Sequence, residues 1–318
     1  MAIVSAERLR VAQLNAGSLL EPGWNERRHE IVAWLAHLGP DIVCLQEVWQ
    51  DGSTPNTAGW IVEQMPDAGW HWHFDGRPFG AQVWPDPALE FGSAILSRWP
   101  IDGGAYHALP LADGADGFVA NVPWELLHVR TAGLDVFTCH LAAAPRDSHH
   151  RRRQVLAIDE IIAAERGDLD ADVSPRNARD AMPAILCGDF NAEPDSDEIR
   201  FLCSLTRLDG RTACYQDAWR VAGDGPGFTQ DWRTNPIAAA LNVHRKRIDY
   251  VFVGDPFMRR GGAGRILAAQ LAFHEPLTGV LASDHAGLVV DVAWPDRPSS
   301  PRPRPARPTR PRPLGSDR

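Results

Sequence analysis

Short apolar segments typical of β-strands recur at nearly even intervals along the chain, and this distribution constrains its fold more than any other feature. We predict strands at residues 8–15, 41–48, 91–101, 125–130, 134–141, 184–187, 247–253, 265–273 and 288–294. Helical patterns occur at about residues 27–38, from Ser148 onward, and at residues 196–205 and 215–222. Because strand-type segments continue to the end of this region, one large domain is favoured over two smaller ones.

The carboxyl-terminal residues differ in composition from the rest of the chain. Of the 318 residues, 44% are hydrophobic, which is enough to bury a large core. Residues 295–318 instead alternate Pro and Arg, so we predict a disordered tail after a domain of residues 1–294. The tail holds seven Arg and two Asp, which leaves 25 basic and 39 acidic residues in the domain, a charge of −14. Such an acidic body does not suit a surface that grips duplex nucleic acid, but it could hold a cation.

The cysteines and the apolar segments bear on the compartment. Cys44, Cys139 and Cys187 each lie inside an apolar strand-like segment, which favours buried, reduced thiols over a disulfide framework. The sequence shows no signal-peptide pattern, and no apolar run approaches the roughly 18 residues of a membrane span. We therefore expect a cytoplasmic protein. No sequence feature indicates an obligate protein partner.

The apolar segment 184–187 leads directly into residues suited to phosphate chemistry. We predict that Gly188 ends this strand and places Asp189 and Asn191 in the loop that follows. A carboxylate can orient or deprotonate an attacking water, and an amide can donate to a phosphoryl oxygen without charge repulsion. The ordinary alternative is a pair of turn residues, which Asp and Asn commonly are after a strand.

Four other strand ends or strand neighbours also carry polar residues. They present Asn15, Glu47, His140 and the pair Asp284 and His285. Each has an ordinary explanation as a turn or structural residue, but five such positions together favour one shared site. Hard cations such as Mg²⁺ prefer carboxylate and carbonyl oxygens, which Glu47, Asp284 and Asn15 supply. Zinc is a poorer fit at these positions, because their histidines lack a zinc-type spacing.

Seven motifs, in their order along the chain, resemble those of the endonuclease/exonuclease/phosphatase superfamily. This superfamily includes DNase I-type nucleases, abasic-site endonucleases, deadenylases, sphingomyelinases and inositol polyphosphate 5-phosphatases. The motifs lie at residues 14–15, 45–47, 92–100, 138–141, 188–191, 247–251 and 283–285. Any one of them is weak evidence, but all of them in this order, from about residue 8 to residue 294, make the resemblance specific.

The resemblance implies an α+β fold and a metal-dependent reaction. The expected architecture is a four-layer α/β/β/α sandwich, in which two mainly antiparallel sheets are flanked by helices. The expected activity is hydrolysis of phosphate esters with Mg²⁺, for which Mn²⁺ could substitute. By position in the motifs, Asn15, Glu47 and Asp284 would lie beside the metal.

The resemblance also implies roles for the remaining motif residues. Asp189 would orient or activate the attacking water, whereas Asn191 and His140 would hold phosphoryl oxygens. His285 would be the active histidine, paired with Asp249, whose carboxylate would fix the imidazole tautomer and favour its charged form. Water would then attack phosphorus in line, without a covalent enzyme intermediate.

Further features narrow the substrate only in part. Arg151 and Gln154 follow His140 with the spacing of the family, and Arg151 is our candidate for binding substrate. His140 resembles the nuclease, sphingomyelinase and deadenylase branches, whereas abasic-site endonucleases usually carry Tyr there. The substrate could be a nucleotide, a nucleic acid, an inositol phosphate or a lipid headgroup. The alternatives are a sphingomyelinase-like lipid phosphodiesterase and, less favoured, an inactive binding module on the same fold.

Overall fold

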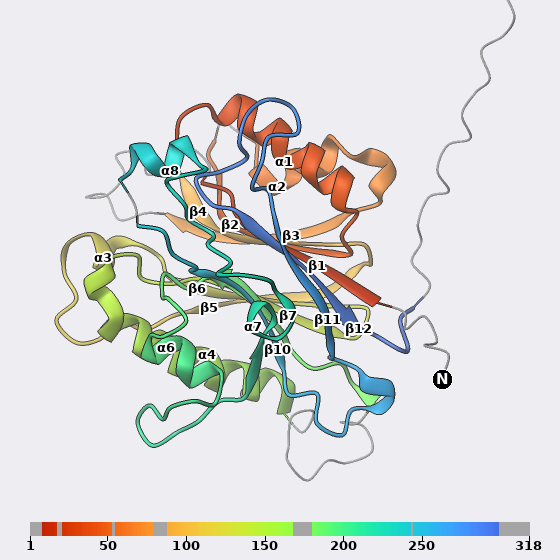
Figure 1. The fold of residues 1–318 in the computed structure, drawn as a ribbon, viewed down its shortest axis with the longest axis vertical. Coiled ribbons are helices and arrows are strands. Elements are labelled where there is room, and N and C mark those ends of the chain that lie inside the picture. The colour runs from red at the N-terminus through yellow and green to blue at the C-terminus, as the bar shows by residue number, and fades with distance from the viewer. Residues whose placement is uncertain are drawn as a thin grey trace, which may run out of the picture.

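The computed structural model describes residues 8–17, 21–52, 55–78, 88–167, 180–242 and 244–298. Two six-stranded sheets pack face to face, and helices cover their outer faces (Figure 1). Both sheets are antiparallel except for one parallel pair in each, β1 with β2 and β7 with β8. The predicted four-layer sandwich of two mainly antiparallel sheets is therefore confirmed. Most of the predicted Pro/Arg-rich tail, from residue 299 on, lies outside the described residues.

The first sheet has the strand order β11-β12-β1-β2-β4-β3. Its strands are β11 (Ile266–Ala272), β12 (Gly287–Ala293), β1 (Arg8–Asn15), β2 (Ile42–Gln50), β4 (Glu90–Ser97) and β3 (His71–Pro78). Its outer face packs on α1 (Trp24–Leu38) and α2 (Thr57–Glu63), followed by a 3₁₀ turn at Pro66–Ala68. Helix α1 buries Ile31, Trp34 and Leu35 on one side, which matches the 3.6-residue apolar pattern of its sequence.

The second sheet has the order β5-β6-β7-β8-β10-β9. Its strands are β5 (Ile101–Ala108), β6 (Glu125–Thr131), β7 (Leu134–His140), β8 (Ile185–Asp189), β10 (Asp249–Gly254) and β9 (Tyr215–Asp217). Helices α3 (Gly117–Asn121), α4 (Ser148–Arg166) and α6 (Asp197–Leu202) cover its outer face (Figure 1). Short helices α7 (Ala218–Ala222) and α8 (Pro236–Ala240) and 3₁₀ turns at Pro145–Asp147 and Arg260–Gly262 complete the described elements.

The core between the sheets follows from the alternation of side chains along each strand. On β1, Leu9 and Val11 face the second sheet, whereas Ala12 and Leu14 pack under the helices of the first. Cys44 and Cys187 belong to the core between the sheets, and both are free thiols. The expectation of buried, reduced cysteines is confirmed for Cys44, Cys139 and Cys187.

Several predicted boundaries were wrong. Strand β8 does not end at Gly188 but continues through Asp189, because Gly188 pairs in register with Cys139 of β7. Strand β2 does not end at Glu47 but continues to Gln50, across an irregularity in its pairing with β4. The segment predicted as a helix at 215–222 begins as strand β9, since Tyr215–Asp217 pair with the edge of β10.

Strands β3 and the greater part of β5 were not predicted. Both lie at an edge of their sheet, where one side of the strand is left without a neighbouring strand. Their side chains are largely exposed or half-buried, so their sequences lack the apolar alternation by which strands are recognised. Within the described part of the chain, no helix combines the length and apolar character needed to cross a membrane.

We expect Gly188→Ala to lower the free energy of unfolding by roughly 2–4 kcal/mol, because strain and overpacking would add. A methyl group on Gly188 would lie 2.2 Å from the carbonyl oxygen of Cys139, and the residue has a φ of 151°. Gly103→Ala is the matched control, since Gly103 also lies on a strand but has open space around it. Chemical denaturation should show a change within about 0.5 kcal/mol for the control. Equal effects of the two substitutions would contradict this explanation.

Candidate active site

Polar side chains connect the two sheets at one end of the sandwich. Gln13 of β1 donates to Asp249 of β10 (3.0 Å) and to Gln46 of β2 (2.8 Å), and Gln46 donates to Thr138 of β7 (2.8 Å). All four side chains are buried. Buried polar groups cost free energy unless they are hydrogen-bonded, so these bonds fix how one sheet lies on the other.

Asn15, at the end of β1, holds two carboxylates. Its Nδ2 donates to Glu47 Oε1 (3.1 Å) and to Asp189 Oδ2 (3.0 Å), and its Oδ1 accepts from the backbone N–H of Gly17 (3.0 Å). Asn15 and Glu47 are on the first sheet and Asp189 is on the second, so this one amide bridges the sheets. The sequence-predicted residues Asn15, Glu47 and Asp189 are therefore brought together.

His285 lies just before β12 and is paired as the sequence predicts. Its Nδ1 is 2.8 Å from Asp249 Oδ2, and its Nε2 lies 3.5 Å from Asp284 Oδ2 and 3.8 Å from Asp189 Oδ2. Burial alone would lower the pKa of His285, but Asp249 and Asp284 outweigh it and raise that pKa well above its ordinary value. Asp249 and Asp284 therefore favour the charged form of the imidazole, and its Nε2 lies near the other carboxylates.

Asp189 is surrounded by donors and cations. Its Oδ1 accepts from the backbone N–H of Asn191 (2.9 Å), and its Oδ2 is 3.6 Å from His140 Nε2. Burial by itself raises the pKa of Asp189, but His140 and His285 outweigh this effect and lower it. Asp189 is thus ionised at neutral pH and can accept a proton or orient a water.

His140 and Asn191 lie on either side of Asp189. His140 ends β7, and its ring packs edge-on against Trp124 at a centroid distance of 5.7 Å. Burial lowers the pKa of His140. Asn191 donates through Nδ2 to the carbonyl of Leu141 (3.1 Å) and has a φ of 48°, a backbone conformation that costs free energy.

Three carboxylates beside this group interact electrostatically with one another. Asp284 Oδ1 and Glu21 Oε2 both lie near the α carbon of Gly17, where an added methyl group would be 3.0 and 3.2 Å from them. Burial raises the pKa of Glu47 to about 8, and Asp284 and Glu21 add to this increase. Burial and Asp284 likewise raise the pKa of Glu21 to about 7.

These carboxylates fit a divalent cation. Among the described residues, Glu47 Oε2 and Glu21 Oε2 are buried and make no hydrogen bond. A bound cation would supply the missing positive charge and would remove the cost of burying ionised oxygens. Because the atoms available to bind a metal are carboxylate oxygens, the site suits Mg²⁺ or Mn²⁺ better than a soft metal.

Sequence reasoning missed two residues of the site. Glu21 lies in the connection between β1 and α1, and Gln230 lies in the loop after α7. Gln230 Nε2 donates to Asp284 Oδ2 (3.0 Å) and lies 2.8 Å from His285 Nε2. Neither residue is part of a periodic pattern. For Gln230 the sequence offers one signal, the Gly, Pro and Trp residues of the segment 223–236, which are typical of a loop that shapes a pocket.

Arg151 does not lie where the sequence predicted. It is buried, and its guanidinium donates to the backbone carbonyls of Ala142 (2.8 Å), Ala144 (2.7 Å) and Pro145 (3.3 Å). Its Nε also lies 3.3 Å from Glu198 Oε1. The prediction that Arg151 binds substrate is corrected, because its donors are used to shape the loop after His140.

We expect Arg151→Ala to lower the free energy of unfolding by about 3–5 kcal/mol, because the fully buried Glu198 would lose its cation. Arg152→Ala, at the next and exposed position, is the control and should have little effect. Urea unfolding measures both. If Arg151 bound substrate, Arg151→Ala would instead raise KM and leave the free energy of unfolding unchanged.

In the absence of divalent cations, we expect stability to fall as pH rises from about 4.5 to about 8. The pKa of Glu47 is about 8 in the folded chain against an ordinary 4.5, so the folded state binds more protons in this range. Glu47→Gln has no such proton to lose and should flatten the slope. Thermal unfolding in a chelator across this range tests it, with the exposed Glu193→Gln as control. Adding Mg²⁺ should restore the stability of the unsubstituted chain at high pH.

Several solved structures share this fold. An endonuclease/exonuclease/phosphatase from Beutenbergia cavernae DSM 12333 is 21% identical, with a TM-score of 0.63 over 92% of this chain and 73% of that chain. TDP2 of D. rerio, complexed with a single-strand DNA product, is 19% identical, with a TM-score of 0.64 over 91% of this chain and 100% of the other. The human Nocturnin catalytic domain with a bound sulfate is 19% identical. Its TM-score is 0.59, over 90% of this chain and 94% of that domain.

The sequence comparisons agree with the fold. No curated protein matches the chain significantly. The model of the Endonuclease/Exonuclease/phosphatase family matches residues 12–285, which extend from β1 to His285 and include most of both sheets. The chain therefore belongs to the endonuclease/exonuclease/phosphatase family.

Proposed function

We propose that this chain hydrolyses phosphate esters with Mg²⁺, and that Mn²⁺ can replace Mg²⁺. The observation that carries the proposal is one contiguous group: the pair of His285 and Asp249 (2.8 Å), Asp189 between His285 and His140, and unpaired carboxylate oxygens beside them. A general base, a charged imidazole and an acidic cation pocket are the parts that hydrolysis of a phosphate ester requires.

In this proposal Glu47 and Asp284 hold the metal, with Glu21 as an additional ligand. Asn15 lies on the metal side and orients Glu47 through the bond from Nδ2 to Oε1. When bound, the metal supplies a Lewis acid for the charge that develops on the phosphoryl oxygens.

The other residues act on the water and on the phosphoryl group. Asp189 is ionised and orients the attacking water, from which it takes a proton. His285 is held in its charged form by Asp249 and stabilises negative charge on a phosphoryl oxygen through Nε2. His140 and the second N–H of the Asn191 amide hold the remaining phosphoryl oxygens. Water attacks directly, and none of these steps needs a covalent bond to the protein.

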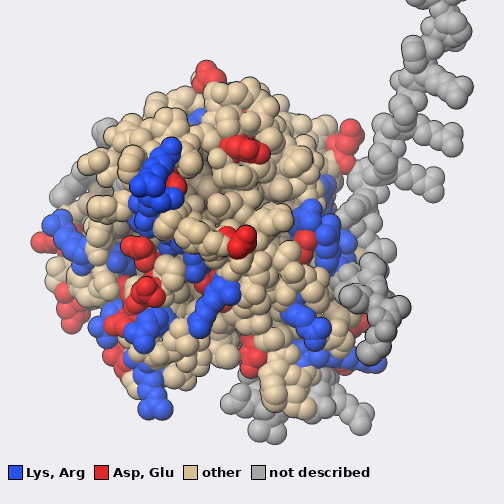
Figure 2. Space-filling view, in the orientation of Figure 1, with Lys and Arg blue, Asp and Glu red and all other residues tan. Residues whose placement is uncertain are grey.

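The charge of the surface limits the kind of substrate. On the face drawn in Figure 2, Lys and Arg side chains alternate with Asp and Glu and do not gather into one continuous basic band. Duplex binding normally uses such a band, because each phosphate contact requires a cation. Residues 1–294 also carry a net charge of −14, so we favour small phosphate diesters or short single strands as substrates. The similarity in fold to TDP2, solved with a single-strand DNA product, supports including single strands.

One observation favours the lipid alternative. An apolar pocket of about 680 Å³ lies between the start of α1 and the segment before Ser283, lined among others by Pro22, Ile237, Val280 and Leu281. Its rim residue Val280 is 36% exposed and the nearby Leu277 is 42% exposed. Such a pocket could take the apolar part of a lipid phosphodiester.

An inactive binding module is less favoured. Inactive relatives of an enzyme commonly lack a metal ligand or the active histidine. Here Glu47, Asp284 and His285 are all present, His285 Nε2 lies 3.5 Å from Asp284 Oδ2, and Glu47 interacts electrostatically with Asp284.

We expect Asp189→Asn and His285→Ala each to lower kcat by about 100-fold or more, because each removes a group that acts in the transition state. Bis-p-nitrophenyl phosphate, single- and double-stranded DNA, RNA, inositol phosphates and sphingomyelin vesicles form the substrate panel, with Mg²⁺ or a chelator. Asp195→Asn, an exposed aspartate of the same loop, is the control and should keep full activity.

The panel also separates the alternatives. Activity confined to the vesicles would favour the lipid substrate, and activity on single strands would favour a nuclease. Hydrolysis that persists in the chelator, or that survives Asp189→Asn unchanged, would refute the proposed mechanism.

A further inference from the structure

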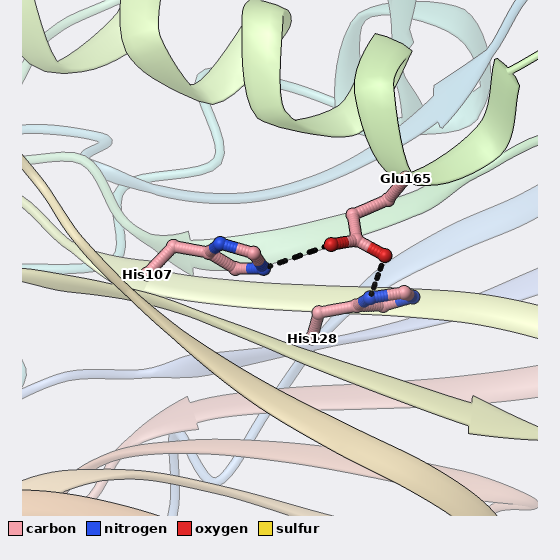
Figure 3. A group of neighbouring side chains, drawn as sticks. All are labelled: His107, His128 and Glu165. Carbon is pink, nitrogen blue, oxygen red and sulfur yellow. Dashed lines mark ion pairs between the residues drawn. The ribbon is translucent and has the colours of Figure 1, made fainter.

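A second group of ligating side chains lies far from the proposed active site. Figure 3 shows His107 of β5 and His128 of β6 pointing at Glu165 in the last turn of α4. His107 Nε2 is 3.6 Å from Glu165 Oε1, and His128 Nδ1 is 3.5 Å from Glu165 Oε2. One ligand atom from each of the three residues lies within 4.8 Å of the other two.

Contacts with Asp135 and Phe137 fix the orientation of the His128 ring. Its Nε2 is 2.9 Å from Asp135 Oδ1, and its ring stacks on Phe137 at a centroid distance of 4.2 Å. Asp135 is itself held by Arg130 Nε (2.9 Å) and Arg166 NH1 (2.8 Å), so it is ionised and accepts the proton of Nε2. A histidine that binds a metal through one nitrogen typically donates from the other to a carboxylate in this way.

This arrangement brings three potential ligand atoms together. Because Nε2 of His128 faces Asp135, its other nitrogen, Nδ1, is the one that faces Glu165 Oε2 (3.5 Å). His107 Nε2 is buried and makes no hydrogen bond among the described residues. A cation placed between the three groups would satisfy them all.

We propose that His107, His128 and Glu165 form a zinc site that fastens the edge strand β5 and strand β6 to the end of α4. Two imidazole nitrogens and one carboxylate oxygen are a ligand set typical of Zn²⁺, whereas Mg²⁺ prefers oxygen alone. In tetrahedral zinc, ligand atoms are about 3.3 Å apart, so the two measured distances need only a small contraction. A water would take the fourth position.

A zinc ion can reach this site from solvent, and the positive charge of the nearby Arg130 does not prevent binding. The side chains of His107 and Glu165 are 22% and 30% exposed, which provides an entry path. Arg130 NH2 lies 3.5 Å from Glu165 Oε2, but the Arg130 side chain is half exposed and also bonds Asp135. Its NH2 also donates to the backbone carbonyl of Glu165 (2.5 Å), so the guanidinium can turn from the Glu165 carboxylate while Nε keeps its bond to Asp135.

The zinc site is separate from the proposed magnesium site. Arg151 and Glu165 are fourteen residues apart on α4, which is about 21 Å at 1.5 Å per residue. Arg151 contacts the loop after His140, so the zinc site is near the opposite end of the helix. Zinc there would act on stability and on the position of β5, not on the reacting phosphate.

The test uses the full chain, freed of metal with a chelator and then given excess Mg²⁺ to occupy the carboxylate pocket. Calorimetric titration with Zn²⁺ should show one tight site per chain, and zinc should raise Tm, because it binds the folded state only. His107→Asn and Glu165→Gln should each weaken zinc by at least the roughly 10–100-fold that loss of an outer partner costs. Both positions are partly exposed, so these variants should fold, which circular dichroism checks.

Two controls locate the zinc. Glu47→Gln impairs the proposed magnesium pocket and should leave the tight zinc site and its effect on Tm unchanged. His71→Asn changes an exposed histidine on β3 and should likewise leave zinc binding and the zinc-dependent rise in Tm unchanged. The proposal is overturned if the unsubstituted chain binds no zinc in excess Mg²⁺, or if His107→Asn and Glu165→Gln bind it equally well. The three side chains would then be a protonated ion-pair cluster.

Discussion

Hydrogen bonds that cross between the two sheets determine the geometry of this molecule. Most of the core between the sheets is apolar, and its contacts are less directional than hydrogen bonds. The bonds from Gln13 to Asp249 and from Asn15 to Asp189 are directional and buried, so a shift of one sheet would leave amides and carboxylates unpaired. The same bonds orient Asp249 and Asp189, and the catalytic geometry is thus a consequence of how the sheets are joined.

Two residues of the site, Glu47 and Asn191, have strained backbone angles that the surrounding packing must maintain. Glu47 lies inside β2 with a φ of 56°, where the pairing of β2 with β4 shifts in register. Asn191 has a φ of 48° directly after Asp189 and Phe190. Non-glycine residues with such angles cost free energy, and they persist only where the surrounding structure determines them fully. At Glu47 the irregularity also turns the carboxylate toward Asn15, which a regular strand would not do.

Apolar runs in the sequence predicted most of the buried strands, and the polar residues beside them predicted one shared site. The four-layer sandwich and the roles of single residues were implied by the resemblance of the ordered motifs to the endonuclease/exonuclease/phosphatase superfamily. Sequence reasoning failed where this logic does not apply. Edge strand β3 has no apolar alternation, Glu21 and Gln230 lie in loops, and Arg151 has ordinary exposed arginines as its neighbours. The continuation of β2 past Glu47 depends on a bulge, which is a property of pairing and not of the local sequence.

The same physical criterion underlies both metal sites that we propose for this chain. In each, at least one buried oxygen or nitrogen atom of the described residues makes no hydrogen bond, which is unfavourable until a cation binds. At the end of the sandwich these atoms are the oxygens of Glu47 and Glu21, which select a hard ion. Beside β5 the atom is His107 Nε2, and together with His128 Nδ1, which faces Glu165, it selects zinc. The zinc ligands lie 21 and 37 residues apart in the sequence, so no short spacing reveals them, and only the pairing of β5 with β6 under α4 brings them together.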